Sequence, residues 1–346
     1  MFQVPECSLP PQKLPLEVLE NVVEAVGLDF DSEQLGPPSR LETLLSCVLV
    51  CRDWVPKSRI YIYRVIRLDS KRRANGFMTT VATFPQLGEY VQELQFNLDG
   101  KHEDWIYRAH QILPSFLPNL DRLEYFHLPI LHDLFFPLST RFKNVTSLEL
   151  YSLQSWSFRD IVRLLNGFSK LQMLEIHGKW TSPGFFFCRP QAEQTLPPAT
   201  LRTYCSGMAQ DHADDVVHWL ARRQPHCPLD RFLLDCDKLS VRSHYMCEVL
   251  RRLSATLETL DLSLSPIGRE ERDGNSYDPD NTWIPAISSC SKLQDFRISI
   301  PSPLRTEWFL DPLVSHLPNS LRRIALNFWN VSNSSEVFPK DPMGFL

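Results

Sequence analysis

One short phrase recurs along most of the chain and limits the fold more than any other feature of the sequence. From residue 91 onward, an apolar-x-x-apolar-x-apolar pattern or a close variant appears as VQELQF, LDRLEY, VTSLEL, LQMLEI, LRTYCS, LDRFLL, LETLDL, LQDFRI and LRRIAL. The fourth residues of these phrases are 94, 123, 148, 174, 204, 232, 260, 296 and 324, so the intervals are 29, 25, 26, 30, 28, 28, 36 and 28 residues. One further interval back lies Ile66, in the strand-like YRVIRL. A near-constant period of this length predicts a repeat architecture, here of about ten units.

The segments between the phrases have the apolar spacing of helices. The clearest are residues 158–170, 214–223, 245–257 and 307–317, and Pro312 is expected to kink or interrupt the last of them. Short strands that alternate with helices predict an α/β fold with a parallel sheet. The pattern resembles the leucine-rich repeat, whose strand phrase is L-x-x-L-x-L. This resemblance implies that residues 61–330 stack as a solenoid with the sheet on its concave face. Because the Asn or Cys that often follows the phrase is mostly missing, we expect an irregular solenoid.

Two segments depart from the repeat. Residues 265–281, SPIGREERDGNSYDPDN, fill the longest interval and are rich in turn formers, which predicts a solvated loop rather than a calcium site. Residues 180–200 contain prolines and a glycine that a repeat helix would not tolerate. Their three phenylalanines, Phe185 to Phe187, either fill the core or contact a partner.

The first 60 residues lie outside the repeat and predict a small helical module over residues 12–60. Its first helix lies in KLPLEVLENVVEAVG (13–27), where apolar residues occupy half of the circumference. This is wider than the stripe that a surface helix needs to pack on its own domain. A turn-rich stretch at 27–40 leads to a second apolar helix, LETLLSCVLVCRDW (41–54), and Pro56 favours the start of a third, PKSRIYIYR.

An LP-x-E-apolar-apolar opening followed by V-C-x-x-W resembles the F-box in the form found in fungal proteins. The resemblance implies docking on Skp1, the adaptor of cullin–RING ubiquitin ligases. The residues that match the motif, and are implied as Skp1 contacts, are Leu14, Pro15, Glu17, Val18, Leu19, Val23, Val50, Cys51 and Trp54. The alternative is that the module only caps the end of the solenoid, because terminal repeats need covering.

Side chains alternate along a strand, so the residue between the last two apolar positions of each phrase faces the concave side. This column reads Arg67, Gln95, Glu124, Glu149, Glu175, Cys205, Leu233, Asp261, Arg297 and Ala325. The three successive glutamates either form a solvated acidic face or receive a basic segment of a client protein. The predicted client-binding residues are Glu124, Phe126, Glu149, Tyr151, Glu175, His177, Arg297 and Arg323.

Composition narrows the function classes further. A net charge of −5 argues against nucleic acid as a partner, and no apolar run is long enough to span a membrane. Residues 1–30 lack the pattern of a signal peptide. Nine cysteines, an odd number, indicate reduced thiols and a cytoplasmic or nuclear location.

The sequence contains no common phosphate-binding, nucleophile or zinc-protease motif. The densest group of possible metal ligands, His212, His218, His226, Cys227, Cys236, His244 and Cys247, lacks the close cysteine pairs of structural zinc sites. We therefore expect no catalytic site, no metal and no cofactor. Stoichiometric zinc in the purified protein would instead favour an enzyme or metal protein built on a solenoid.

Together these features predict the substrate-recognition subunit of a Skp1–cullin–F-box ubiquitin ligase. Residues 12–60 would dock on Skp1, residues 61–330 would present a client protein, and residues 1–11 and 331–346 would be tails. The alternative within binding proteins is a scaffold that holds Skp1 without promoting degradation.

Overall fold

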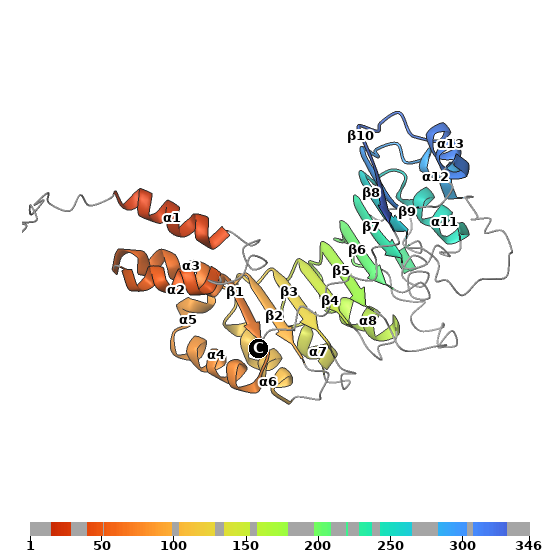
Figure 1. The fold of residues 1–346 in the computed structure, drawn as a ribbon. Coiled ribbons are helices and arrows are strands. Elements are labelled where there is room, and N and C mark those ends of the chain that lie inside the picture. The colour runs from red at the N-terminus through yellow and green to blue at the C-terminus, as the bar shows by residue number, and fades with distance from the viewer. Residues whose placement is uncertain are drawn as a thin grey trace, which may run out of the picture.

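In the computed structural model of the chain, the described residues contain ten β-strands that form a single parallel sheet. Every strand pairs only with the strands that come before and after it in the sequence, so the sheet runs from β1 to β10 in chain order (Figure 1). The predicted α/β class and parallel sheet are therefore confirmed. The strands are β1 (Val65–Leu68), β2 (Glu93–Asn97), β3 (Arg122–Phe126), β4 (Ser147–Tyr151), β5 (Met173–Gly178), β6 (Thr203–Met208), β7 (Arg231–Cys236), β8 (Thr259–Leu264), β9 (Asp295–Ser302) and β10 (Arg323–Asn330).

The structure describes residues 15–28, 40–50, 52–98, 104–128, 135–152, 158–178, 197–208, 219–220, 228–236, 243–264, 283–302 and 307–330. The expected loop at 265–281, most of the segment 180–200, and both tails lie outside these ranges. Among the helices that they contain, none combines the length and the apolar character that a membrane span requires.

The register of the sheet agrees with the column read from the sequence. Arg67 lies opposite Gln95, and the same row continues through Glu124, Glu149, Glu175, Cys205, Leu233, Asp261, Arg297 and Ala325. The rows on either side of it contain the apolar residues of the phrases, such as Leu94 and Phe96, which are fully buried. The phrase thus places one row of mostly polar side chains between two rows of core side chains.

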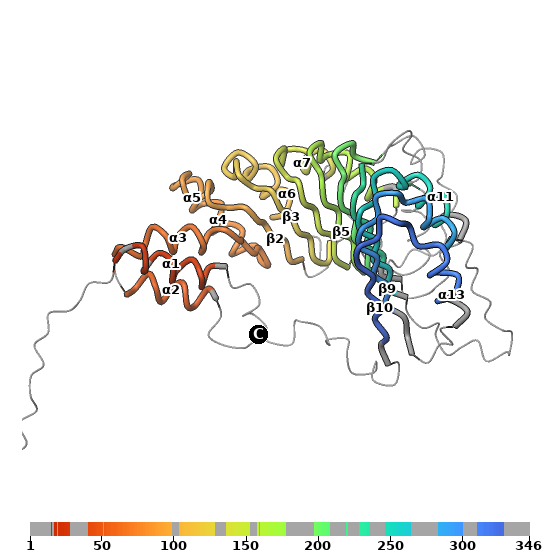
Figure 2. The backbone as a smooth tube through the Cα atoms, turned by 90° about the horizontal axis from the view of Figure 1, so that it is seen from above, coloured from red at the N-terminus to blue at the C-terminus, as the bar shows by residue number. Residues whose placement is uncertain are grey.

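The core lies between the sheet and the helices on its outer side (Figure 2). A leucine or phenylalanine buried there contributes roughly 1.5–3 kcal/mol relative to an exposed one. Helix α13 continues past Pro312, and of the expected helix at 214–223 the structure describes only Trp219 and Leu220, which are buried. The helices of this layer are α4 (Lys71–Thr83), α5 (Pro85–Gly88), α6 (Asp104–Ile112), α7 (Phe135–Ser139), α8 (Phe158–Leu165), α11 (Ser243–Leu253), α12 (Ile284–Ile287) and α13 (Glu307–Ser315).

Polar side chains in the turns before the strands bond one unit to the previous one. Each lies four residues before the central apolar residue of its phrase and donates to a main-chain carbonyl of the preceding unit. These bonds were not predicted from the sequence, although an Asn, Thr or Ser recurs at this constant offset. The pairs are Asn119 to Glu89, Asn144 to Pro118, Thr200 to Leu171, Thr256 to Leu229 and Ser320 to Leu293, over 2.5–2.9 Å.

Among the described residues before the sheet are three helices and a short 3₁₀ turn. They are α1 (Leu16–Leu28), α2 (Arg40–Val50), the turn η2 (Arg52–Trp54) and α3 (Val55–Arg64). A small core of Val23, Leu44, Cys47 and Tyr61 joins the three helices. Gly27 permits the close approach of α1 to α3, because a Cβ atom at this position would lie 2.3 Å from Cγ of Tyr61.

Helix α3 leads into the sheet without a linker. It ends at Arg64, β1 begins at Val65, and the carbonyl of Arg64 accepts a hydrogen bond from the amide of Gln92 at 3.0 Å. The orientation of the N-terminal helices is therefore tied to the first strand of the sheet.

Candidate functional site

Large apolar side chains lie in solvent on the three N-terminal helices. Leu41, Leu45 and Leu49 are spaced four residues apart, so they form one stripe along α2, and Leu49 is 86% exposed. Single exposed leucines are common on protein surfaces, whereas a group of them marks a contact surface. We call this group the helical apolar face; it consists of Val18, Val22, Leu41, Leu45, Leu49, Val50 and Ile60.

The structure separates the predicted Skp1-contact residues into two kinds. Pro15, Glu17, Val18 and Val50 are exposed. Val23 is fully buried and Trp54 packs against the same small core, so both stabilise the helices from inside and Val23 offers no surface to a partner. Leu14, Cys51 and the side chain of Leu19 lie outside the described part of the chain. The four-residue leucine spacing of α2 was visible in the sequence, but the predicted set omitted five members of the helical apolar face: Val22, Leu41, Leu45, Leu49 and Ile60.

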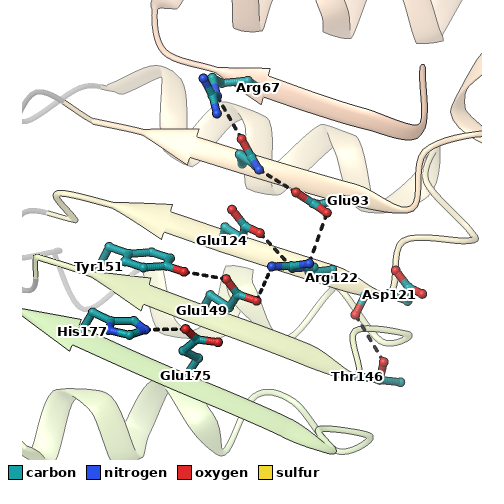
Figure 3. A network of polar contacts seen from close by, with 11 residues as sticks. Arg67, Glu93, Asp121, Arg122, Glu124, Thr146, Glu149, Tyr151, Glu175 and His177 are labelled. Atoms are coloured by element: carbon teal, nitrogen blue, oxygen red, sulfur yellow. Dashed lines mark hydrogen bonds and ion pairs between the residues drawn. The ribbon is translucent and has the colours of Figure 1, made fainter. Parts of the chain in front are cut away.

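On the inner face of the sheet, Arg122 of β3 lies among three carboxylates from three neighbouring strands (Figure 3). Its Nε atom is 2.8 Å from Oε1 of Glu124, and its Nη2 atom is 2.6 Å from Oε1 of Glu149. The Nη1 atom is 3.7 Å from Oε2 of Glu93 on β2. Arginine is suited to this position because its guanidinium presents several donors in a fixed plane.

Hydrogen bonds extend this arrangement from β1 to β4, and a separate polar pair lies beside it on β5 (Figure 3). Arg67 donates to Gln95 at 2.9 Å, and Gln95 donates to Glu93 at 2.6 Å. The Tyr151 hydroxyl donates to Oε2 of Glu149 at 2.8 Å, and Nε2 of His177 contacts Oε1 of Glu175. We call this set the polar network; it consists of Arg67, Glu93, Gln95, Arg122, Glu124, Glu149, Tyr151, Glu175 and His177.

An aromatic stack lies at the carboxyl ends of β3, β4 and β5. The ring centroids of Phe126 and Tyr151 are 4.6 Å apart, those of Tyr151 and His177 are 4.9 Å apart, and the rings of both pairs are nearly parallel. The His177 ring leans over Gly207 on β6, where a Cβ atom would lie 2.5 Å from its Nδ1 atom. All three rings are only partly buried, so part of the stack is available to a ligand or partner.

Burial shifts the pKa values of two members of the polar network, Glu124 and Tyr151. Together with the nearby carboxylates of Glu93 and Glu149, it raises the pKa of Glu124 to about 8, although Arg122 opposes this shift. Burial also raises the pKa of Tyr151, and the neighbouring Glu149 adds to the effect. At neutral pH, Glu124 is therefore mostly protonated.

The prediction that three successive glutamates form an open acidic surface is wrong for Glu124 and Glu149. The side chains of Glu124 and Glu149 are only 5% and 1% exposed, because Arg122 lies against both and Tyr151 bonds to Glu149. Neither a solvated acidic face nor a ready receptor for a basic segment fits this burial. Glu175 and His177 remain partly exposed, while Arg297 and Arg323 are exposed towards the other end of the sheet. The sequence showed the column, but it did not show that one arginine would cover two of its members.

The group of possible metal ligands predicted from the sequence falls mostly outside the described residues. Of its members, Cys247 is buried in the core beside the sheet. Within the described ranges, no three His, Cys, Asp or Glu side chains are arranged to hold a metal ion.

Comparison with known proteins adds no family to these observations. No protein-family model matches the chain, and no curated protein matches it. The function must therefore be argued from the helical apolar face, the inner face of the sheet and the sequence motifs.

Proposed function

We propose that the chain is the substrate-recognition subunit of a Skp1–cullin–F-box ubiquitin ligase. In this proposal, α1 to α3 are an F-box that docks on Skp1. The sheet and its helices are an irregular leucine-rich-repeat solenoid that presents a client protein. The observation that supports this proposal most is the helical apolar face, because α1 and α2 leave large apolar side chains in solvent after their shared core is filled.

The chemistry of the helical apolar face suits a protein partner. Protein interfaces combine an apolar centre with a polar rim. Val18, Val22 and the α2 leucines supply apolar side chains, and Glu17 and Glu42 are exposed on the same helices. Pro15 and Glu17 of the F-box-like opening are exposed as well. The capping alternative does not account for this face, because a cap buries its apolar side chains against the repeat.

The aromatic stack on the inner face is the client surface that we favour. Phe126, Tyr151 and His177 offer flat, half-buried rings that the polar network holds in place through Glu149 and Glu175. Aromatic side chains are enriched at protein interfaces because they bury much area at little conformational cost. Arg297 and Arg323 would add positive charge at the far end of the same face. The chain itself performs no chemistry in this role and acts by positioning the client.

Co-purification with Skp1 tests the proposal. We expect the wild-type chain to retain Skp1, and Leu45→Asp with Leu49→Asp to weaken binding by roughly 30-fold or more, as for the loss of an interface hot spot. These positions are preferable to Trp54, because an alanine there would also disturb the core of the helices.

Val314→Asp is the matched control, because Val314 is an exposed apolar residue on α13 at the opposite end of the sheet. It should leave Skp1 binding unchanged. Failure of the wild-type chain to bind Skp1 would refute the proposal, as would equal binding by the double variant. Skp1 binding without recruitment of cullin would instead favour the scaffold.

A further inference from the structure

The last strand carries a row of apolar side chains that the described part of the chain leaves open. Ile324 and Leu326 of β10 lie opposite Phe296 and Ile298 of β9 in the sheet register. The two β9 residues are fully buried, whereas Ile324 is 46% exposed and Leu326 is 38% exposed. Phe328 continues the row and is 52% exposed. The core therefore extends to β9, and the described part of the chain does not cover the same positions on β10.

The opposite edge of the sheet differs. Leu68 of β1 is buried, Ile66 packs against the core, and helices α3 and α4 both contact β1. A repeat protein needs a cover at each end, because a terminal unit otherwise exposes its core face. An exposed, apolar edge strand is also a site for unwanted pairing with other chains.

Residues 331–346 are placed to supply the missing cover. They follow directly on Asn330, which is the last residue of β10. Their first part, VSNSS, is rich in residues that favour turns. The second part, EVFPKDPMGFL, contains Val337, Phe338, Met343, Phe345 and Leu346.

The lengths also agree. From Ile324 to Phe328 the strand advances about 13 Å, at about 3.3 Å per residue. The eleven residues 336–346 reach up to roughly 33 Å when extended, so they can return along the whole row. Pro339 and Pro342 lack the amide hydrogen that a central strand needs, but an outermost segment tolerates them. We propose that residues 331–346 fold back along β10 and cover Ile324, Leu326 and Phe328 with their own apolar side chains.

Hydrogen exchange in the full-length chain tests the proposal without truncation. One variant replaces the five apolar residues of the tail by serine: Val337→Ser, Phe338→Ser, Met343→Ser, Phe345→Ser and Leu346→Ser. We expect the amides of residues 323–330 to exchange at least tenfold faster in this variant, because the strand loses its cover. The matched control is Lys340→Ser with Asp341→Ser, which changes the same segment without removing apolar contacts and should leave exchange unchanged.

A second background separates contact from a general loss of stability. With Ile324→Thr, Leu326→Thr and Phe328→Thr already present, the serine tail should have no further effect on β10. Unchanged exchange of β10 in the serine variant of the wild-type background would overturn the proposal. Protection of β10 that depends on protein concentration would also overturn it, because a second copy of the chain would then be the cover.

Discussion

At the scale of single residues, the polar network depends on Arg122. Three carboxylates from β2, β3 and β4 approach this one side chain, and two of them are almost completely buried. A buried charge without a partner is much more costly than the pair is favourable. The loss of Arg122 alone should therefore lower the free energy of unfolding more than the joint loss of Arg122 and its carboxylate partners.

We expect Arg122→Met to lower the free energy of unfolding by about 2–4 kcal/mol, because Glu149 would remain buried without its cation. Adding Glu149→Gln to this variant should restore part of the loss. Urea unfolding measures both effects. Arg323→Met is the control, since Arg323 occupies the same row as Arg122 on β10 and lies 3.5 Å from the more exposed Asp295. It should cost less than about 1 kcal/mol. Equal losses for the two arginines would contradict the role given to Arg122.

Glu124 should make the stability depend on pH. Its folded-state pKa of about 8 lies above the ordinary value of 4.5, so between these values the folded chain binds more protons than the unfolded chain. The contribution of this residue to stability is therefore lost as the pH rises from 4.5 to 8. Glu124→Gln keeps the shape of the protonated acid but cannot ionise, so the variant does not lose this stability as the pH rises. At pH 9 it should be about 1–3 kcal/mol more stable than the wild type. Urea midpoints of both proteins at pH 5 and pH 9 provide the measurement. A difference that stays constant across this range would show that Glu124 does not titrate there.

At the scale of elements, the packing of α1 on α3 depends on a glycine inside a helix. Alanine normally stabilises a helix relative to glycine by roughly 0.5–1 kcal/mol. Gly27 should behave in the opposite way, because the ring of Tyr61 occupies the place of its Cβ atom.

We expect Gly27→Ala to destabilise the N-terminal helices by about 1–3 kcal/mol through overpacking. Gly76→Ala in α4 is the matched control, since no atom lies within 4 Å of the Cβ position there, and it should be neutral or stabilising. Thermal unfolding of the two variants compares them directly. Stabilisation by both substitutions would mean that α1 does not pack on Tyr61 as described.

The strands and the helices were not equally predictable from the sequence. The strand phrase repeats its apolar positions in nearly every unit, so both the strands and the register of the column could be read in advance. Val23 and Trp54 were placed on a partner surface because a motif shows which residues recur, but not which of them fill the module's own core. The burial of Glu124 and Glu149 depends on where the long side chain of Arg122 lies, which no periodicity reveals.

At the scale of the whole molecule, the direct continuation of α3 into β1 fixes the helical apolar face relative to the sheet. A flexible Gly-Ser insertion of eight residues between Arg64 and Val65 should leave the contacts within each part intact. We expect small-angle X-ray scattering to show a larger maximum dimension for this variant, and the proposed function further predicts an unchanged affinity for Skp1. The same insertion in the loop between β2 and α6 is the control and should preserve the scattering profile. An unchanged profile for the first insertion would show that other contacts hold the two parts together.

The order of the strands also determines how the molecule would respond to force. Among the described strands, β10 is bonded only to β9 and each earlier strand only to its immediate neighbours, so tension applied beyond β10 acts on one strand and its helix at a time. In a repeat protein, each unit contacts only its neighbours, so the loss of one unit leaves the rest standing. Pulling from this end should peel the sheet as a series of small ruptures of similar length rather than in a single event. The sheet would then open strand by strand from β10 and re-form from the strands that remain paired.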